Sequence, residues 1–342
     1  MTKQVIQVGI GGMGNTWLRT VLGSPEFEHS AFVEISDGIA QRQVQTYGLD
    51  PSKIFKTLDE ALAAVPADGV INVTPPQFHK EISIKALEAG IPVLSEKPLA
   101  DTLESAKDIV RKADETGVLH MVTQNYRYSV PAQTLKSTID SKALGEIGAL
   151  TVGFFKGPRF GGFREEMDYP LIIDMSIHHL DMMRYFLDSD PVWVYGRSWN
   201  PAWSWYRGDA SAAVVIGFAN GVVVSYNGSW CSTGMETTWN GNWRVECEKG
   251  IISLEDDQVH TQLVGMRGSV YPFLTAATHT VIVPPVQMEH VAQAYLLHEF
   301  YQALTEGRRP ATTCQDNIKS LSLVFDVIRS FESGEVIHCQ SS

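Results

Sequence analysis

The sequence is short of positive charge, of cysteine and of long hydrophobic runs. Its 342 residues include 27 Lys and Arg against 39 Asp and Glu, and the formal net charge of −12 repels the phosphates of nucleic acid and of anionic lipid. No apolar stretch approaches the ~18–20 residues that a membrane span requires. We therefore expect no nucleic-acid partner and no membrane partner. The cysteines form no close pair, which argues against a disulfide framework and a thiolate metal site; they are Cys231, Cys247, Cys314 and Cys339.

The remaining composition is that of a folded globular protein. Apolar residues make up 44% of the chain and charged residues 19%, which excludes a disordered chain. A length of 342 residues suits two domains of ~100–200 residues each. The first ten residues, MTKQVIQVGI, enter an apolar strand without the basic segment or cleavage site of a leader, so we expect a cytoplasmic location.

The order of the apolar runs predicts two domains of different architecture. Over residues 1–122, short apolar runs alternate with helical patterns, which is typical of a doubly wound α/β Rossmann domain with a mostly parallel sheet. Over residues 123–342, β-type runs follow one another across short turns such as Asn220-Gly221. This pattern predicts an α+β domain with a large open, mostly antiparallel sheet.

The expected elements can be placed along the chain. In the first domain the strands are expected at 5–8, 31–35, 70–73, 93–94 and 119–122, with helices at 17–22, 58–64, 79–89 and 102–115. In the second domain the strands are expected at 151–155, 212–218, 222–229, 243–247 and 251–254, with one helix at about 172–186. Two terminal helices, at about 288–306 and 314–334, are candidates for packing back on the first domain.

A glycine-rich segment follows the first strand. Residues 9–14, GIGGMG, fit the pattern G-x-G-x-x-G, which lets backbone N–H groups approach a pyrophosphate at a helix N-terminus. Asp37 is expected to end the second strand, 23 residues after Gly14, and to bind the adenosine ribose hydroxyls. This carboxylate favours NAD over NADP, although Arg42 on the next helix leaves NADP possible. The alternative is an ordinary glycine-rich turn and a capping Asp.

Two proline turns follow later strands. A Thr-Pro-Pro turn at residues 74–76 ends one strand, with His79 at the start of the next helix, and a Glu-Lys-Pro turn at residues 96–98 ends another. Both turns are expected at the carboxyl edge of the sheet, where open α/β sheets bind ligands. Lys97 is therefore a candidate for the cofactor crevice. A helix-entry turn and a solvated surface lysine are the alternatives.

Taken in order, these motifs closely resemble those of the Gfo/Idh/MocA family of NAD(P)-dependent oxidoreductases, and the resemblance covers essentially the whole chain. The motifs are GIGGMG at 9–14, Thr-Pro-Pro-x-x-His at 74–79, Glu-Lys-Pro at 96–98 and Gln-Asn-Tyr-Arg-Tyr at 124–128. The resemblance implies a Rossmann domain, a large open sheet domain and oxidation or reduction of sugars and cyclic polyols. The residues then expected to contact NAD are Gly9, Gly11, Gly12, Met13, Gly14, Asp37, Arg42, Thr74, Pro75, Pro76, His79, Glu96, Lys97 and Asn125.

A third family element is a helix with the pattern Asp-x-x-x-His-x-x-Asp, and Asp174, His178 and Asp181 match it. Spacings of four and seven place these residues along one helical face, whereas His179 points away toward a structural role. Asp and His at this spacing can also ligate a metal ion, but no convincing third ligand follows. A core helix with a satisfied histidine is the other alternative. Ser176 stands where the family commonly has Gly, which predicts a different local pocket shape.

Oxidation of a secondary alcohol requires a hydride acceptor, a base and a donor to the alcohol oxygen. The resemblance assigns the base to His178, because imidazole, with an ordinary pKa of about 6.5, is largely neutral near pH 7. Lys97 as an ammonium would donate to the same oxygen, and Asp174 would orient the substrate or hold the Lys97 charge. Further substrate contacts are expected from Tyr126, Arg127, Lys156 and Arg159. For these four, packing, ion-pair or solvated-loop roles are the alternatives.

We thus expect an NAD-dependent dehydrogenase that oxidises a ring hydroxyl of an inositol-like cyclic polyol or of a pyranose sugar or glycoside. The alternatives are a glycoside-cleaving enzyme that oxidises C3 and recycles NAD, an NADP-linked aldose or keto-sugar oxidoreductase, and a non-catalytic NAD sensor. Seven of the eight tryptophans lie between Trp193 and Trp243, which favours a sugar-binding wall or a subunit interface. An open sheet needs a cover on its free face, so a homodimer or homotetramer is expected.

Overall fold

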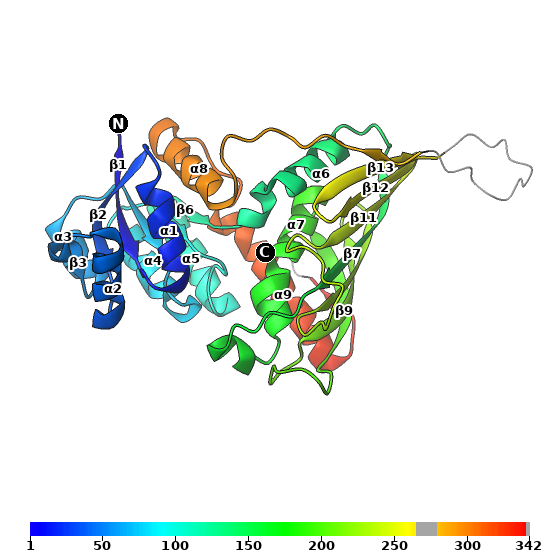
Figure 1. Cartoon of the computed structure of the whole chain (residues 1–342), viewed down its shortest axis with the longest axis horizontal. Helices are drawn as coiled ribbons and strands as arrows, with labels where there is room; N and C mark the ends of the chain where they lie inside the picture. Colours follow the sequence, from blue (N-terminus) through cyan, green and yellow to red (C-terminus); the bar gives the residue numbers. More distant parts are fainter. Residues whose placement is uncertain (265–278, 340–342) are drawn as a thin grey trace, which may run out of the picture. The chain divides into compact units, whose positions relative to one another are not determined.

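The computed structural model describes residues 1–264 and 279–339 and divides into two compact units. The first unit comprises Met1–Asn125 and His290–Leu321, and the second comprises Tyr126–Glu289 and Ser322–Ser342. The chain thus returns to the first unit after it has built most of the second. Each unit is organised around a β-sheet of its own (Figure 1).

The first unit is a doubly wound α/β domain, as the sequence predicts. Its six parallel strands lie in the order β3-β2-β1-β4-β5-β6. The chain reverses its direction across the sheet between β1 and β4, and at such a switch point open sheets bind ligands beyond the carboxyl ends of the strands. The strands are β1 (Lys3–Val8), β2 (Phe27–Val33), β3 (Ile54–Phe55), β4 (Gly69–Asn72), β5 (Val93–Ser95) and β6 (His120–Val122).

Helices cover both faces of this sheet. Helix α1 contacts α8, and α4 contacts α5. The crossover connections run from β1 toward opposite edges of the sheet, so the helices of the two sets lie on opposite faces. Central strands such as β1 are therefore buried on both sides and read as continuous apolar runs. The helices are α1 (Gly12–Leu22), α2 (Asp37–Tyr47), α3 (Leu58–Ala64), α4 (His79–Glu88), α5 (Leu103–Thr116) and α8 (Ala292–Glu306), with short turns η1 (Pro51–Lys53) and η2 (Pro76–Phe78).

The second unit is built on a nine-stranded sheet in the order β14-β13-β12-β11-β7-β10-β9-β8-β15. Only the neighbours β7 and β10 are parallel among the described strands of this sheet, so the expected open, mostly antiparallel sheet is confirmed. The strands are β7 (Ile147–Phe155), β8 (Pro191–Trp199), β9 (Ser211–Phe218), β10 (Val223–Ser229), β11 (Asn242–Cys247), β12 (Gly250–Glu255), β13 (Gln258–Leu263), β14 (Val281–Ile282) and β15 (Ile337–His338).

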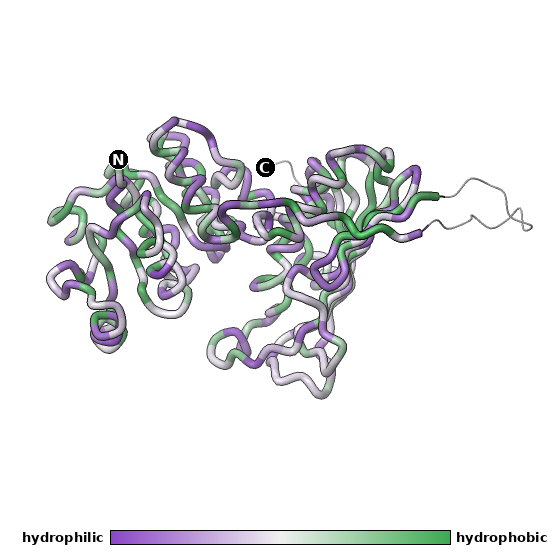
Figure 2. The backbone as a smooth tube through the Cα atoms, turned by 45° about the horizontal axis from the view of Figure 1, so that its top comes forward, coloured by the Kyte–Doolittle hydropathy of each residue, from purple (hydrophilic) through white to green (hydrophobic). Residues whose placement is uncertain are grey.

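Helices α6 and α7 lie on one face of the nine-stranded sheet (Figure 1). Strands of this sheet alternate buried and exposed positions, as β10 does, and Figure 2 shows the corresponding mixture of hydrophobic and hydrophilic residues along them. None of the helices in the described ranges is long and apolar enough to cross a membrane. The remaining helices are η3 (Asn125–Tyr128), α6 (Val130–Asp140), η4 (Gly162–Glu166), the π-helical η5 (Leu171–Ser176), α7 (Ile177–Leu187) and α9 (Cys314–Ser333).

The structure differs from the expected elements at several places in this unit, and strands β13, β14 and β15 were not expected. Helix α6 was not expected; Ser129 caps it by accepting a hydrogen bond from the Ala132 N–H. Strand β8, which contains Trp193 and Trp199, was also not expected, because Gly196 and Arg197 weaken its apolar alternation. The single helix expected over 172–186 is instead the π-helical η5 followed by α7.

Candidate functional site

The glycine loop has the geometry of a pyrophosphate site. A Cβ on Gly9, whose φ is +88°, would lie 2.8 Å from the Val73 carbonyl oxygen, and a Cβ on Gly14 would lie 2.3 Å from the Gly9 carbonyl oxygen. A Cβ on Gly12 would meet no atom within 4 Å. No side chain caps the N-terminus of α1 at Gly11, and no acid stands in its first turn. The start of α1 is therefore uncapped and has open space at Gly12, which suits a dinucleotide phosphate.

The acid at the end of β2 is Glu34, not Asp37. Strand β2 ends at Val33, and Asp37 is the first residue of α2. The Asp37 carboxylate is 82% exposed and pairs with Lys56 at 2.5 Å, which lowers its pKa. Glu34 is buried, and its Oε2 accepts a hydrogen bond of 3.2 Å from the Ile10 N–H. The expected strand at 31–35 began four residues too late and ended two residues too late, and this error hid Glu34.

A second buried side chain holds the glycine loop from the same side. Gln43 on α2 donates from Nε2 to the Ile10 carbonyl oxygen at 2.7 Å, whereas its neighbour Arg42 is exposed. Together with Glu34, Gln43 satisfies both backbone groups of Ile10. Neither residue was predicted from the sequence. For Gln43 the available signal was a polar side chain at a helix position that faces the core.

His79 joins the two proline turns. Its Nδ1 lies 2.8 Å from the Pro98 carbonyl oxygen, and its Nε2 lies 2.8 Å from the Thr74 carbonyl oxygen. The side chain is fully buried, which lowers its pKa. A neutral imidazole carries one N–H, so the ring donates to one of these two carbonyl oxygens, and His79 lies between the loops after β4 and β5.

Lys97 stands at the carboxyl end of β5, beside a fixed carboxylate. Glu96 is buried, and it accepts a hydrogen bond from Trp17 Nε1 at 2.7 Å and another from the Lys97 N–H at 3.1 Å. Trp17 belongs to α1, the helix that the glycine loop opens. The Glu-Lys-Pro turn is thus tied through Glu96 to the phosphate-loop helix, which sets the Lys97 backbone in place.

In the second unit Asp174 lies in the π-helical turn before α7. Its Oδ2 is 2.6 Å from Arg164 Nε, and the Arg164 guanidinium lies 4.8 Å from the centre of the Phe163 ring. Such π-helical turns are frequent at functional sites because they redirect side chains without ending a helix. The part of the chain that the structure describes has no group of three His, Cys, Asp or Glu side chains arranged for a metal ion.

His178 opens α7 and is covered by Tyr126. The two rings stack with centroids 4.1 Å apart at an angle of 24°. Burial and the nearby charge of Asp174 raise the pKa of Tyr126, so the phenol stays neutral. His179 is enclosed by Phe154 and Tyr226, and burial lowers its pKa to about 4. The structure thus brings Tyr126, Asp174 and His178 together and leaves His179 as a neutral core residue.

Arg127 is committed to a buried ion pair. Its Nε and one of its terminal nitrogens lie 2.5 and 2.7 Å from the two carboxylate oxygens of Asp181, and both side chains are at least 95% buried. Gln133 Nε2 donates to the Arg127 carbonyl oxygen at 2.7 Å. This arrangement corresponds to the structural alternative for Arg127, and it anchors the segment that carries Tyr126 to α7.

Lys156 and Arg159 follow β7 and lie against aromatic rings. Lys156 Nζ is 2.9 Å from Glu236 Oε2 and 5.1 Å from the centre of the Trp239 ring. The Arg159 guanidinium lies 4.0 Å from the centre of the Trp205 ring. The loop therefore offers cations and aromatic faces on the same segment that carries Arg164.

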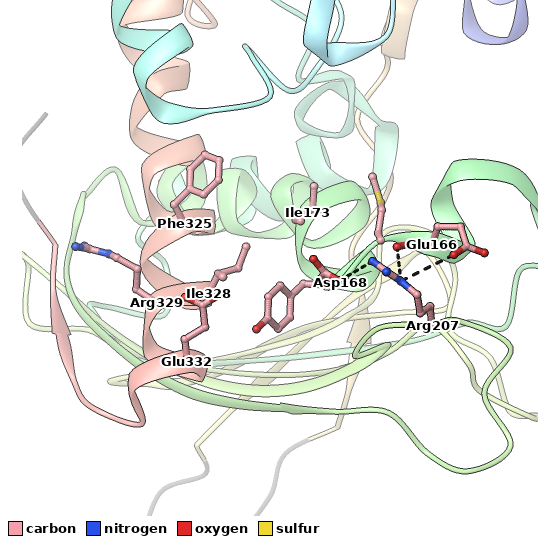
Figure 3. Close-up of a pocket in the computed structure, with 10 residues that line it drawn as sticks. Glu166, Asp168, Ile173, Arg207, Phe325, Ile328, Arg329 and Glu332 are labelled. Carbon is pink, nitrogen blue, oxygen red and sulfur yellow. Dashed lines mark hydrogen bonds and ion pairs between the residues drawn. The ribbon is translucent and has the colours of Figure 1, made fainter.

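A cavity of about 590 Å³ in the second unit lies beside this region (Figure 3). Arg207 pairs there with Asp168 at 2.7 Å. No residue of the predicted site lines the cavity, although Ile173 next to Asp174 does. The described residues that line it are Glu166, Met167, Asp168, Tyr169, Ile173, Arg207, Phe325, Ile328, Arg329 and Glu332.

The fold and the glycine loop define a dinucleotide-binding protein. Comparison with family models extends this assignment: residues 3–124 match the oxidoreductase family with an NAD-binding Rossmann fold, and residues 132–253 match the Gfo/Idh/MocA C-terminal domain. Among curated relatives, the uncharacterized protein y4oX of Sinorhizobium fredii is 30% identical, over 99% of this chain and 96% of its own. The scyllo-inositol 2-dehydrogenase (NAD(+)) of Bacillus subtilis is 27% identical, over 80% of this chain and 78% of its own.

The solved structures agree on the fold. An oxidoreductase from Agrobacterium radiobacter, in complex with NAD+, L-tartaric acid and magnesium, superposes with a TM-score of 0.87 at 19% identity and covers 99% of both chains. The chain belongs to the Gfo/Idh/MocA family and is an NAD(P)-dependent oxidoreductase. Members of this family act on CH–OH groups.

Proposed function

We propose that the protein is an NAD-dependent dehydrogenase that oxidises a ring hydroxyl of a cyclic polyol or of a pyranose sugar or glycoside. The observation that carries the proposal is that the second unit holds an imidazole and a carboxylate in fixed positions. The Tyr126 ring stacks on His178, and Arg164 pairs with Asp174. A protein that only senses NAD has no need of an oriented imidazole and a fixed acid beside it. The inositol dehydrogenases among the relatives support the cyclic-polyol class.

Each residue has a role in the proposed reaction. The glycine loop would hold NAD, which would supply the acceptor for the hydride of the carbinol carbon. The Lys97 ammonium donates to the alcohol oxygen and stabilises the charge that develops there. His178 takes the hydroxyl proton as a neutral base, and the Tyr126 ring keeps the imidazole in one orientation. Asp174, fixed by Arg164, accepts hydrogen bonds from a neighbouring hydroxyl of the ring.

The loop after β7 is the proposed substrate wall. The aromatic faces of Trp205 and Trp239 suit the C–H faces of a sugar ring, while Lys156 and Arg159 offer donors to its hydroxyls. Arg127 takes no direct part in this proposal, because its guanidinium is occupied by Asp181.

We assign the adenosine ribose to Glu34 in place of Asp37. Glu34 lies at the carboxyl end of β2 and touches the glycine loop, whereas the Asp37 carboxylate is exposed and pairs with Lys56. A carboxylate at the end of β2 accepts bonds from the ribose hydroxyls and repels a 2′-phosphate. This position therefore supports a preference for NAD over NADP.

A panel of inositols, aldoses and glycosides, assayed with NAD+ and with NADP+, tests the proposed function. We expect NAD+ reduction with at least one neutral ring polyol or sugar, and loss of that activity in the His178→Asn variant. Glycoside cleavage without net NADH would instead support the redox-assisted lyase. Activity with NADP+ alone would overturn the assignment of Glu34.

We further propose that a second copy covers the outer face of the nine-stranded sheet. Exposed apolar side chains lie along it, including Phe155, Tyr195, Trp199 and Val223, around a shallow hollow of about 400 Å³. Light scattering after size exclusion should give at least a dimer, and Trp199→Glu should weaken it. A monomeric wild type at micromolar concentration contradicts this assembly.

A further inference from the structure

Strand β1 carries one fully buried amide next to the glycine loop. Gln7 is 0% exposed and stands two residues before Gly9, between the buried apolar residues Ile6 and Val8. A buried amide needs partners for both its carbonyl oxygen and its NH2 group, since an unsatisfied buried polar group is destabilising. The partners that Gln7 finds are therefore informative.

The NH2 group of Gln7 joins the two ends of the glycine loop. Nε2 donates to the Gly14 carbonyl oxygen at 2.7 Å and to the Gly9 carbonyl oxygen at 3.1 Å. Gly9 and Gly14 are the first and last glycines of the motif, and no side chain fits between them, because a Cβ on Gly14 would lie 2.3 Å from the Gly9 oxygen. One amide thus fixes how closely the two ends approach.

The orientation of this amide is set by a histidine on the neighbouring strand. His29 Nε2 lies 3.0 Å from Gln7 Oε1. Burial lowers the pKa of His29 to about 3, so the ring is neutral near pH 7 and carries one N–H. Since an amide oxygen only accepts, that hydrogen sits on Nε2 and directs the Gln7 NH2 group toward the two glycine carbonyls.

We propose that Gln7 is a positioning residue for dinucleotide binding: it sets the width of the glycine loop, and His29 holds Gln7 in the required orientation. The N–H groups at the start of α1 point at a pyrophosphate only while the loop keeps its curvature, and the two Gln7 bonds maintain that curvature. The inference concerns binding of the cofactor and does not depend on which substrate is oxidised.

The Gln7→Glu variant tests the proposal, because it keeps the side-chain length and replaces the NH2 donor by an oxygen that faces two carbonyl oxygens. Gln7→Met removes the donor without adding charge. We expect the Kd of NAD+ and the Kd of ADP-ribose, measured by calorimetry, to rise at least tenfold and by the same factor in both variants. Equal loss for the two ligands places the effect in the ADP-ribose portion that they share, which contains the pyrophosphate, and not at the nicotinamide.

The matched control is Ser83→Ala, which removes another buried bond of the same unit, from His120 Nε2 to Ser83 Oγ at 2.9 Å. This control is expected to lower the melting temperature and to leave both Kd values within twofold of wild type. Folded Gln7 variants with wild-type Kd values overturn the proposal. If Ser83→Ala weakens binding as much as the Gln7 variants do, the loss of affinity comes from general destabilisation. That result overturns the proposal as well.

Discussion

The two units arrange their functional groups by different physical means. In the first unit the glycine loop presents backbone N–H groups, and short buried side chains such as Glu34 and Gln43 hold that backbone. In the second unit the candidate groups are side chains fixed by other side chains, as His178 is by Tyr126 and Asp174 is by Arg164. The glycine loop of the first unit thus depends on backbone shape, while the candidate site of the second unit depends on pairs of long or aromatic side chains.

The two kinds of site tolerate different changes in sequence. A backbone site is set by glycine, strand order and a few hydrogen bonds, so one nucleotide loop serves many reactions. A site made of paired side chains changes its shape with each pair, which suits substrate selection. The proline turns belong to the first kind, since His79 fixes them through two backbone carbonyls.

The largest effect is expected for Lys97→Met. Loss of the ammonium removes the donor to the alcohol oxygen, so kcat should fall by about 10²–10³-fold, while the Kd of NAD+, measured by calorimetry, changes little. Lys85→Met is the matched control, because Lys85 pairs with Asp59 on the surface of the same unit. Unchanged turnover in the Lys97 variant contradicts the assigned role.

Arg127→Met should produce the largest loss of stability in the second unit. Removing one partner of a buried ion pair leaves the Asp181 charge uncompensated, which costs about 3–5 kcal/mol of unfolding free energy. Arg244→Met, which breaks an exposed pair with Glu246, should cost less than about 1 kcal/mol. Urea denaturation of both variants measures the difference, and equal losses would refute the distinction between the two pairs.

Stability should fall on acidification because burial holds several histidines in the neutral form. Burial lowers the folded-state pKa to about 3 for His29 and His120 and to about 4 for His179. Below about pH 6.5 the unfolded chain binds a proton at each of these histidines and the folded protein does not. The free energy of unfolding therefore falls as the pH is lowered, by about 2 kcal/mol for each histidine at pH 5. Two of the three lie in the first unit.

Denaturation at pH 7.5, 6 and 5 measures this slope. In His179→Gln the unfolding free energy should fall less steeply with decreasing pH, because about one proton fewer is taken up on unfolding. A wild-type slope in that variant would show that His179 is already protonated in the folded protein.

The smallest effect concerns the choice of cofactor. Glu34→Gln removes the charge next to the glycine loop and should shift the ratio of kcat/KM for NADP+ over NAD+ upward by about tenfold, equivalent to about 1.4 kcal/mol. Asp37→Asn should change that ratio by less than about twofold, because its carboxylate is exposed and pairs with Lys56. A larger change in this ratio for Asp37→Asn than for Glu34→Gln would show that Asp37, and not Glu34, binds the ribose.

Much of the first unit could be read from local pattern. Helix α3 occupies the expected residues because Thr57 and Glu60 form a capping box, a device that is complete within four residues. In the second unit the hairpin at Asn220-Gly221 was also found, since its turn is specified by its own residues. The two-residue strand β3 was missed because its extended form depends on pairing with β2.

The class of fold, the glycine loop and the family could be predicted from the sequence, because glycine positions, caps and apolar periodicity act over a few residues. Only the tertiary structure decided which acid touches the glycine loop, that Arg127 is bound to Asp181, and that Tyr126 covers His178. These contacts join residues 24, 54 and 52 positions apart in the sequence. Their geometry depends on how the sheet and helices pack, and no local pattern encodes it.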